Sequence, residues 1–205
     1  MSTGSDLQHQ FGGIDIYLFD QLLRGRIRPG TRVVDAGCGS GRNLVFFLRE
    51  GYEVFATDAD LPSIEGVRRL AAELAPQLPD SNFRFEPVEH MSFDDGMADV
   101  VISSAVLHFA RDDRHFGAMV QEMWRIMKPG GMLFCRIASN IGMEERMVPL
   151  GDGRFLLPDG SERYLVNASM LMNLTEVLGG TLLDPLKTTV VQDQRCMTTW
   201  VLRKG

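Results

Sequence analysis

An acidic residue followed by evenly spaced glycines is the part of this sequence best suited to chemistry. Asp35 ends a short apolar run. Glycines then occupy every second position, at Gly37, Gly39 and Gly41. A turn with so few side chains lets backbone N–H groups come close to a ligand that larger residues would hold away. At the end of a parallel strand, such a turn meets its ligand at the start of the next helix. The stretch therefore predicts a ligand-binding turn between a strand and a helix.

The spacing of this turn separates the ligand classes that use glycine-rich turns. A dinucleotide fingerprint of the form G-x-G-x-x-G needs glycine or alanine at position 42, where this chain has Arg42. A phosphate-binding Walker loop needs G-K-[ST], which does not occur here. The pattern that stands in the chain is D-x-G-x-G-x-G. Its spacing disfavours a nicotinamide dinucleotide and a nucleoside triphosphate.

Cationic and aromatic residues outside the turn suggest contacts with a second ligand. Arg136 and the pair Arg163-Tyr164 suit an anionic group, because a guanidinium binds a carboxylate through two parallel hydrogen bonds. The competing interpretation is that these arginines form structural salt bridges. Tyr17 and Phe11 could fold over a ligand from the amino-terminal segment, and the alternative for Tyr17 is a place in the core.

Hydrophobic periodicity predicts the elements that must position these residues. Helical spacing marks residues 14–26, 42–50, 62–76 and 113–127. Apolar runs typical of strands fall at residues 32–36, 52–60, 82–90, 98–109 and 132–139. The Lys128-Pro129-Gly130-Gly131 stretch is expected to end the preceding helix abruptly. Strands alternating with helices at this spacing predict a parallel sheet covered on both faces.

The carboxyl-terminal third follows a different pattern. Residues 140–165 contain two turn signals, Gly-Asp-Gly and Pro-Asp-Gly, around a short apolar run, which predicts either a plain hairpin or a movable lid. A helix is expected over residues 167–178. The apolar runs 181–191 and 195–204 are separated by only three residues, so they must be antiparallel neighbours. We expect a single domain over residues 1–205, with a helical cap at 1–30.

Composition narrows the class of protein and its partners. The chain has 205 residues, 44% of them hydrophobic and 23% charged, as in ordinary globular proteins. A formal net charge of -6 argues against nucleic acid as the main partner. We find neither a signal-peptide pattern nor an apolar run that could span a bilayer, so we expect a cytoplasmic protein without a membrane partner. Cys38, Cys135 and Cys196 lack metal-ligand spacing, and no metal site is predicted.

Several motifs in order resemble the class I methyltransferases that use S-adenosylmethionine (SAM). D-x-G-x-G-x-G is similar to the first motif of that family, and "GYEVFATDAD" ends its strand in the acid Asp58 as the family's second strand does. "FDDGMADVVISSAVLHF" looks like the family's fourth-strand segment, and "MWRIMKPGG" like the helix-to-strand corner that follows. The resemblance covers roughly residues 11–203. "GCGSGRN" followed by "GYEV" particularly resembles the small bacterial methyltransferases of the tellurite-resistance type, although residues from 140 onward do not.

This resemblance implies a fold and a cofactor. The fold would be of the α/β class, a Rossmann-like doubly wound sheet of seven strands, mostly parallel with an antiparallel last strand. SAM would be the cofactor and S-adenosylhomocysteine the product. The residues at the family's cofactor positions are Asp35, Gly37, Cys38, Gly39, Asp58, Ala59, Glu89, His90, Ser103 and Ser104.

The resemblance also implies roles for individual residues. Asp58 would accept hydrogen bonds from both ribose hydroxyls, and Ala59 would lie against the adenine. Glu89 stands where many relatives have Asp at the adenine edge. His108 follows the fourth strand, where many relatives place a residue that faces the methyl acceptor, and a histidine there could act as a base. The alternative for His108 is a purely structural side chain.

We therefore expect a methyltransferase that acts on a small-molecule acceptor. Two other classes remain as alternatives: a SAM-binding regulator or partner subunit without turnover, and a nicotinamide-dependent oxidoreductase. Arg42 and the antiparallel end of the sheet disfavour the oxidoreductase. Release of S-adenosylhomocysteine separates the methyltransferase from the regulator.

Overall fold

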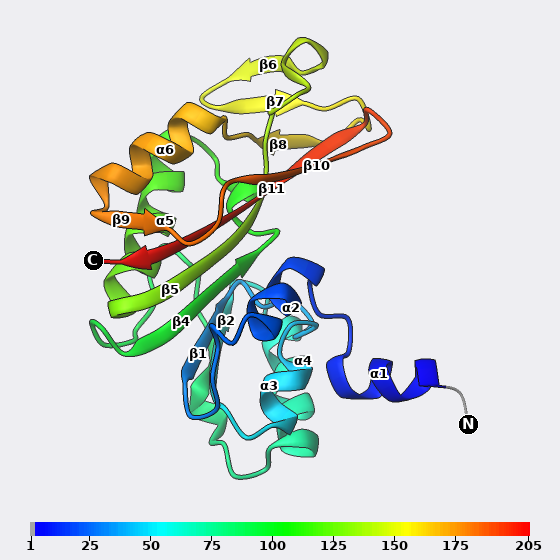
Figure 1. Cartoon of the computed structure of the whole chain (residues 1–205), viewed down its shortest axis with the longest axis vertical. Coiled ribbons are helices and arrows are strands. Elements are labelled where there is room, and N and C mark those ends of the chain that lie inside the picture. The colour runs from blue at the N-terminus through cyan, green and yellow to red at the C-terminus, as the bar shows by residue number, and fades with distance from the viewer. Residues whose placement is uncertain (1–2) are drawn as a thin grey trace.

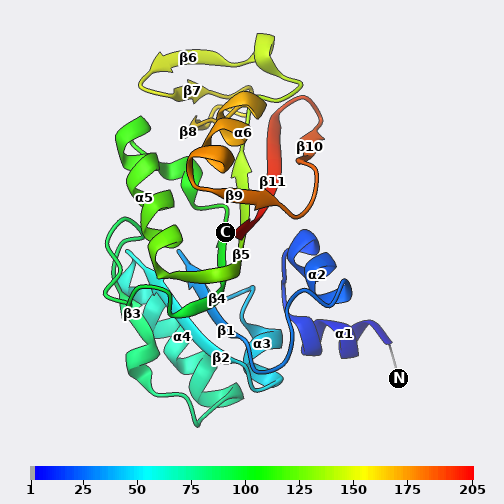
Figure 2. The same ribbon diagram turned by 60° about the vertical axis from the view of Figure 1, so that its left-hand side comes forward.

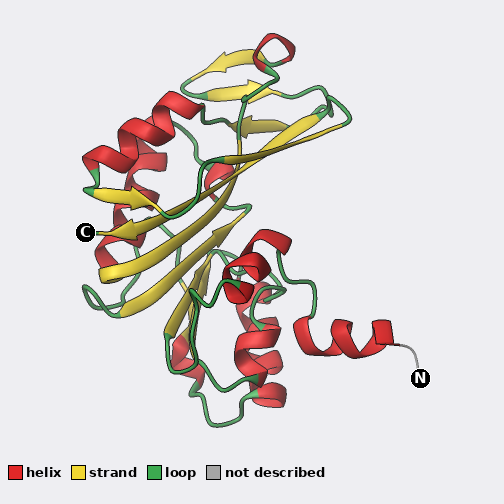
Figure 3. Ribbon diagram, in the orientation of Figure 1, coloured by secondary structure: helices red, strands yellow, loops and turns green. Residues whose placement is uncertain are grey.

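A twisted eight-stranded sheet forms the centre of the protein in a computed structural model that describes residues 3–205 (Figures 1 and 3). The strand order is β10-β11-β5-β4-β1-β2-β3, and the short strand β9 pairs with β11 outside this path. Helices cover both faces of the sheet. The arrangement confirms the predicted α/β class, with β9 added to the seven strands expected.

Five neighbouring strands run parallel, and their carboxyl ends meet at one edge of the sheet. They are β1 (Arg32–Ala36), β2 (Glu53–Asp58), β3 (Phe83–Phe85), β4 (Ala98–Ser104) and β5 (Met127–Ala138). The central strands β1 and β4 are buried on both faces, which explains their continuous apolar sequences. Asp35 pairs in register with Ala56 of β2 and Ile102 of β4. Side chains that follow these three strands therefore lie close together at one edge of the sheet.

The helices bury their apolar faces in two clusters on opposite sides of the sheet. Phe47 and Ile64, from α3 and α4, pack with Val33, whereas Phe116 from α5 packs with Val34 on the other side. Adjacent strand residues point to opposite faces, so β1 contributes to both clusters. No helix among residues 3–205 is long and apolar enough to cross a membrane. The helices are α1 (Thr3–Phe11), α2 (Ile16–Leu23), α3 (Val45–Arg49), α4 (Leu61–Leu74), α5 (Asp113–Ile126) and α6 (Ala168–Val177).

The last strands confirm the predicted antiparallel edge. β11 (Arg195–Lys204) runs antiparallel to β5, and β10 (Lys187–Val191) runs antiparallel to β11. The run expected as one strand over 181–191 is divided into β9 (Gly180–Leu182) and β10. Pro185 lies between them, and proline cannot donate a ladder hydrogen bond.

Three predicted boundaries differ from the structure. β3 spans only three residues, and the chain beyond it turns over Pro87 to His90. β4 ends at Ser104 because Ala105 adopts a left-handed backbone with φ 66°, and a 3₁₀ turn over Leu107–Phe109 follows. Residues 128–131 do not separate helix from strand but begin β5, beside a bulge in its pairing with β4.

Residues 140–165 form a small unit of their own rather than a simple hairpin. A 3₁₀ turn (Glu144–Arg146) leads into a three-stranded antiparallel sheet of β6 (Val148–Gly151), β7 (Arg154–Leu156) and β8 (Glu162–Tyr164). This sheet lies beside the hairpin of β10 and β11 in both views (Figures 1 and 2). Met147 and Leu157 pack there with Cys196 of β11 in a separate apolar cluster.

Candidate active site

The turn after β1 presents backbone amides at the carboxyl edge of the sheet. Gly37 and Gly39 adopt left-handed conformations with φ values of 82° and 51°. A Cβ atom at Gly37 would lie 2.6 Å from Val106, so a larger residue does not fit there. A Cβ atom at Gly39 would meet nothing within 4 Å, because this residue borders an open cavity. The backbone of the turn at Gly39 is therefore open to a ligand in the cavity.

Asp58 holds this turn from the end of β2. Its Oδ2 accepts a hydrogen bond from the Gly39 amide at 2.7 Å, and its Oδ1 accepts one from the Asp60 amide at 2.9 Å. A carboxylate has about four acceptor sites, so each oxygen can accept a further bond. Asp58 also lines the cavity beside Gly39. Its carboxylate can therefore receive a pair of ligand hydroxyl groups.

The glycine-turn cavity, bordered by Gly37 to Ser40 and Asp58, has a volume of about 500 Å³. That volume lies within the range of small-molecule and cofactor sites. Most of the predicted cofactor residues line it, namely Gly37, Cys38, Gly39, Asp58, Ala59, Glu89 and Ser104. Sequence analysis missed other lining residues, among them Arg42, Asn43, Val88, Phe109 and His115.

The remaining predicted cofactor residues do not line this cavity. Asp35 and Ser103 are buried behind it, and neither side chain has a hydrogen-bond partner among the described residues. Burial raises the pKa of the Asp35 carboxyl to about 7, against the opposing effect of Arg42 and with a contribution from Asp58. His90 is exposed, in the turn after Pro87. The polar groups of Asp35 and Ser103 are thus free to form hydrogen bonds behind the turn, whereas the side chain of His90 lies at the surface.

Glu89 meets the cavity together with residues from α5 and the loop before it. Its Oε1 lies 2.9 Å from Nε2 of His115 and 3.7 Å from the guanidinium of Arg111. All three side chains line the glycine-turn cavity. The partners of Glu89 come from a different element, so no local spacing in the sequence indicated them.

A buried network around Asp15 connects the amino-terminal segment to the same edge of the sheet. The Asp15 side chain is fully buried, and its Oδ2 accepts from Arg136 at 3.0 Å and from the Ser104 hydroxyl at 3.1 Å. Arg42 donates to the same hydroxyl at 2.9 Å, and the Asp15 amide donates to Asn43 at 2.9 Å. Asp15 is also the N-cap of α2. Sequence analysis missed this residue, although its place before an apolar helical pattern was a usable capping signal.

A second cavity of about 290 Å³, which we call the arginine cavity, adjoins the first. It is lined by Arg136, Arg163 and Arg195, by His108, and by Leu157 and Ser161 from residues 140–165. Ala105 lines both cavities, and its left-handed backbone stands at their common wall. Non-glycine residues held in this conformation are found preferentially at functional sites. The two cavities therefore bring two ligands within reach of each other.

His108 lies on the 3₁₀ turn after β4 and is 6% exposed. Its Nδ1 has no hydrogen-bond partner among the described residues. Burial, with the nearby positive charge of Arg163, lowers the pKa of the imidazole to about 4. The ring is therefore neutral near pH 7 and can accept a proton or a hydrogen bond.

Comparison with known proteins agrees with this geometry. A family described as a methyltransferase domain matches residues 34–135, the stretch from β1 through most of β5. This chain belongs to the class I SAM-dependent methyltransferases. The matched stretch includes the glycine turn, Asp58 and His108 of this methyltransferase.

The relatives of this chain are distant in sequence. A ubiquinone biosynthesis O-methyltransferase of Chelativorans sp. is 27% identical, over 77% of this chain and 64% of its own length. A 2-methyl-6-phytyl-1,4-hydroquinone methyltransferase of Synechocystis sp. is 32% identical, over 69% of this chain and 39% of its own. A SAM-dependent methyltransferase structure from Methanosarcina mazei matches with a TM-score of 0.68 at 21% identity, covering 89% of this chain and 96% of that one. The chain thus spans less than two thirds of these two curated relatives.

Two residues predicted to contact substrate, Tyr164 and Tyr17, lie outside both cavities. The ring of Tyr164 is fully buried against Phe116, and its hydroxyl donates to Asp113 at 2.7 Å. Tyr164 therefore packs in the core and does not face either cavity. Tyr17 stands nearer the site, since its ring lies 5.7 Å from the Arg136 guanidinium, but its hydroxyl is paired with Thr189 at 2.7 Å.

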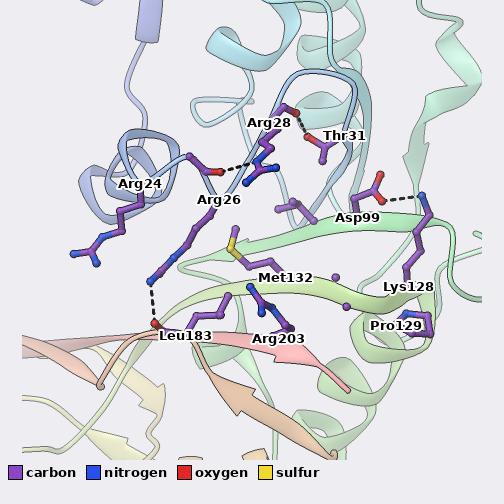
Figure 4. Close-up of a pocket in the computed structure, with 14 residues that line it drawn as sticks. Arg24, Arg26, Arg28, Thr31, Asp99, Lys128, Pro129, Met132, Leu183 and Arg203 are labelled. Atoms are coloured by element: carbon purple, nitrogen blue, oxygen red, sulfur yellow. Dashed lines mark hydrogen bonds and ion pairs between the residues drawn. The ribbon is translucent and has the colours of Figure 1, made fainter.

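A third cavity lies away from the predicted chemistry of the methyltransferase, on the side where β1 and β5 begin (Figure 4). It has a volume of about 450 Å³ and is lined by several basic residues, including Arg24, Arg26 and Lys128. Acidic partners balance many of these charges: Arg26 pairs with Asp184 at 2.7 Å, and Lys128 pairs with Asp99 at 2.8 Å. Its basic lining therefore has a structural explanation.

Proposed function

We propose that this protein transfers a methyl group from SAM to a small organic acceptor. The observation that carries the proposal is the meeting of two cavities at Ala105, one built on a glycine turn and an acidic strand end, the other lined by charged side chains and a buried histidine. Both lie at the carboxyl edge of the sheet, where doubly wound folds bind their ligands. The names of the two curated relatives, a ubiquinone biosynthesis O-methyltransferase and a hydroquinone methyltransferase, support an organic molecule as the acceptor.

The residues around the glycine turn suit SAM. Asp58 would accept from the ribose hydroxyls, and Ala59 with Val88 would contact the adenine. Gly37, Cys38 and Gly39 would border the methionine portion, since Gly39 leaves room where a side chain would intrude. Asp35 and Ser103, buried behind the cavity without partners, would accept hydrogen bonds from the ammonium group through water. When bound, SAM supplies a methyl carbon activated by the positive sulfur.

The chain itself would then align the acceptor and accept its proton. His108 is the candidate base, because its neutral imidazole lines the arginine cavity with Nδ1 unpartnered. Arg136 and Arg163 would position the acceptor from two sides. A low pKa makes His108 a weak base, which suits a nucleophile whose proton is lost only as the methyl bond forms.

Two segments would enclose the reacting groups. The described part of the predicted amino-terminal cap, residues 3–30, would cover one side, with α2 held by Asp15, and Tyr17 belongs to this cap. Residues 140–165 would cover the other side, since Leu157, Asp159, Ser161 and Arg163 line the arginine cavity. Closing a site excludes water from the reaction.

The negative net charge of the chain favours a small-molecule partner over nucleic acid. The cytoplasm is the compartment that we propose.

The proposal is tested by turnover. The protein is incubated with methyl-labelled SAM and a panel of phenols, amines, thiols and carboxylic acids, and S-adenosylhomocysteine is measured by mass spectrometry. We expect acceptor-dependent release of S-adenosylhomocysteine with label in the product. SAM binding without release across the panel would favour the regulator or partner subunit instead.

A further inference from the structure

The charges of the arginine cavity do not cancel. Arg136 pairs with Asp15 at 3.0 Å, and Arg42, which lines the glycine-turn cavity and not this one, lies 3.8 Å from the same carboxylate oxygen. Arg163 and Arg195 have no carboxylate within ion-pair distance among residues 6–205, and Asp159 is the acidic side chain that lines the cavity with them. Two guanidinium groups against one carboxylate leave one net positive charge. A monoanion therefore balances the cavity better than a neutral molecule or a dianion.

The two unmatched arginines retain donors for a ligand. Arg163 donates to the backbone carbonyl of Glu162 at 2.7 Å and lies 5.1 Å from the ring of Phe109, which holds its guanidinium in place. No hydrogen bond from the Arg195 side chain occurs within the described chain. The planar fork of a guanidinium matches a carboxylate in a bidentate geometry. Both side chains can thus bind a carboxylate without giving up a structural contact.

Buried polar atoms in the same cavity give an independent indication of a ligand. His108 is 6% exposed with Nδ1 unpartnered, and the Nε of Arg136 is also buried without a partner. Buried polar groups in native proteins are nearly always paired, so an exception in a cavity indicates a missing partner. Both residues are close to Ala105, which lines both cavities: its amide donates to the Arg136 carbonyl at 2.8 Å, and His108 follows it by three positions.

We infer that the methyl acceptor carries a carboxylate, which Arg163 and Arg195 bind as an anchor while the rest of the molecule extends past His108 toward Ala105. This inference rests on the proposed function and names its substrate class. A carboxylate bound by two guanidinium groups has its lone pairs occupied, so it orients the acceptor and a different atom receives the methyl group. Arg195 thereby becomes a specificity residue that sequence analysis missed.

The test is calorimetric titration with benzoate and with benzamide, which have nearly the same shape and differ by one charge. The protein is first saturated with S-adenosylhomocysteine, and the titration is repeated with Arg163→Gln and Arg195→Gln. Arg146→Gln is the matched control, because Arg146 lies in residues 140–165 but pairs with Asp193 at 3.0 Å outside the cavity.

We expect benzoate to bind the wild type about tenfold more tightly than benzamide, which corresponds to one charge-assisted contact. Each cavity variant should lose about tenfold in benzoate affinity with little change for benzamide, and the control should match the wild type. The inference is overturned if benzoate binds no better than benzamide, including the case in which neither binds, or if phenyl phosphate binds better than benzoate. Failure of S-adenosylhomocysteine to bind in the first step would instead contradict the proposed function.

Discussion

At the scale of single residues, Gly39 combines two requirements, a left-handed backbone and an empty space beside it. Gly51 also has a left-handed backbone, with φ 72°, and a Cβ atom there would meet nothing within 4 Å. It lies at the end of α3, however, and does not line the glycine-turn cavity. The two glycines therefore form a matched pair for substitution by alanine.

We predict that Gly39→Ala and Gly51→Ala each lower the free energy of unfolding by about 1 kcal/mol, because alanine is strained in the left-handed region. Only Gly39→Ala should weaken SAM binding, by at least about tenfold, since its methyl group enters the cavity. Denaturant unfolding and calorimetry measure the two effects. Equal SAM affinity in both variants would place the cofactor away from this turn.

Asp35 gives a prediction about pH. Its folded pKa of about 7 lies above the unfolded value of 3.8, so the folded protein binds an additional proton between these limits. The contribution of this proton to stability is complete below about pH 4 and is lost as the pH rises through about 7. Asp35→Asn cannot ionise and should lack this decline. The free energy of unfolding is measured for wild type and variant from pH 4 to pH 8. If the two curves run parallel, Asp35 is ionised in the folded protein throughout this range, and the prediction is wrong.

Residues on the glycine turn were predictable because their signal is local. Gly37, Gly39 and Asp58 each stand at the end of a strand that periodicity locates, and all three line the cavity. The place of Tyr164 was not predictable, since its adjacency to Arg163 said nothing about which face of β8 each side chain occupies. The place of Arg195 was not predictable either, because this residue begins β11, far along the chain from Arg163. Tyr164 points into the core, whereas Arg195 reaches the cavity from the far end of the chain.

At the scale of elements, the start of α2 depends on contacts that cross the whole chain. Asp15 caps this helix and also accepts from Arg136, 121 positions away. Asp60 caps α4 with a comparable bond to the Ser63 amide at 3.0 Å, but it is exposed and has no buried cationic partner among the described residues. Comparing the two separates capping from ion pairing.

We predict that Asp15→Ala lowers the free energy of unfolding by roughly 3 kcal/mol, because Arg136 is left without its counter-ion. Asp60→Ala should cost about 1 kcal/mol, the usual value of a lost cap. Urea titrations of both variants provide the comparison. If the two costs are equal, the Asp15–Arg136 pair adds nothing to stability, and the attachment of α2 rests on apolar packing alone.

The type of each helix and strand was predictable from periodicity, whereas the residues at which several of them begin or end were not. The buried runs of β1 and β4 and the caps of α4, α5 and α6 are encoded within a few residues. The break at Ala105 has no such signal, because alanine rarely adopts a positive φ and the surrounding packing imposes it. Residues 128–131 contain proline and two glycines, yet they join β5 because β4 pairs with Met127 and Met132 on either side of them, across a bulge.

At the scale of the whole molecule, the topology of the fold brings segments that are distant along the chain together at the arginine cavity. The antiparallel edge of β11 and β10 brings Arg195 beside β5, while residues 140–165 supply the opposite wall with Arg163. The sequence predicts the class of the fold from its alternation of strands and helices. Three residues of the arginine cavity, His108, Arg136 and Arg163, were predicted from the sequence, but their meeting with Arg195 was not, because the cavity joins four segments that are distant along the chain.

The central claim is that the glycine-turn cavity binds SAM through Asp58, and calorimetric titration with SAM tests it most directly. We predict that the wild type binds SAM and that Asp58→Ala binds about tenfold to a hundredfold more weakly, the cost of losing a charged acceptor for two hydroxyl groups. Asp94→Ala is the control, since Asp94 is exposed and lies outside the cavity; it should match the wild type. Unchanged SAM affinity in Asp58→Ala, or no SAM binding by the wild type, would contradict the account.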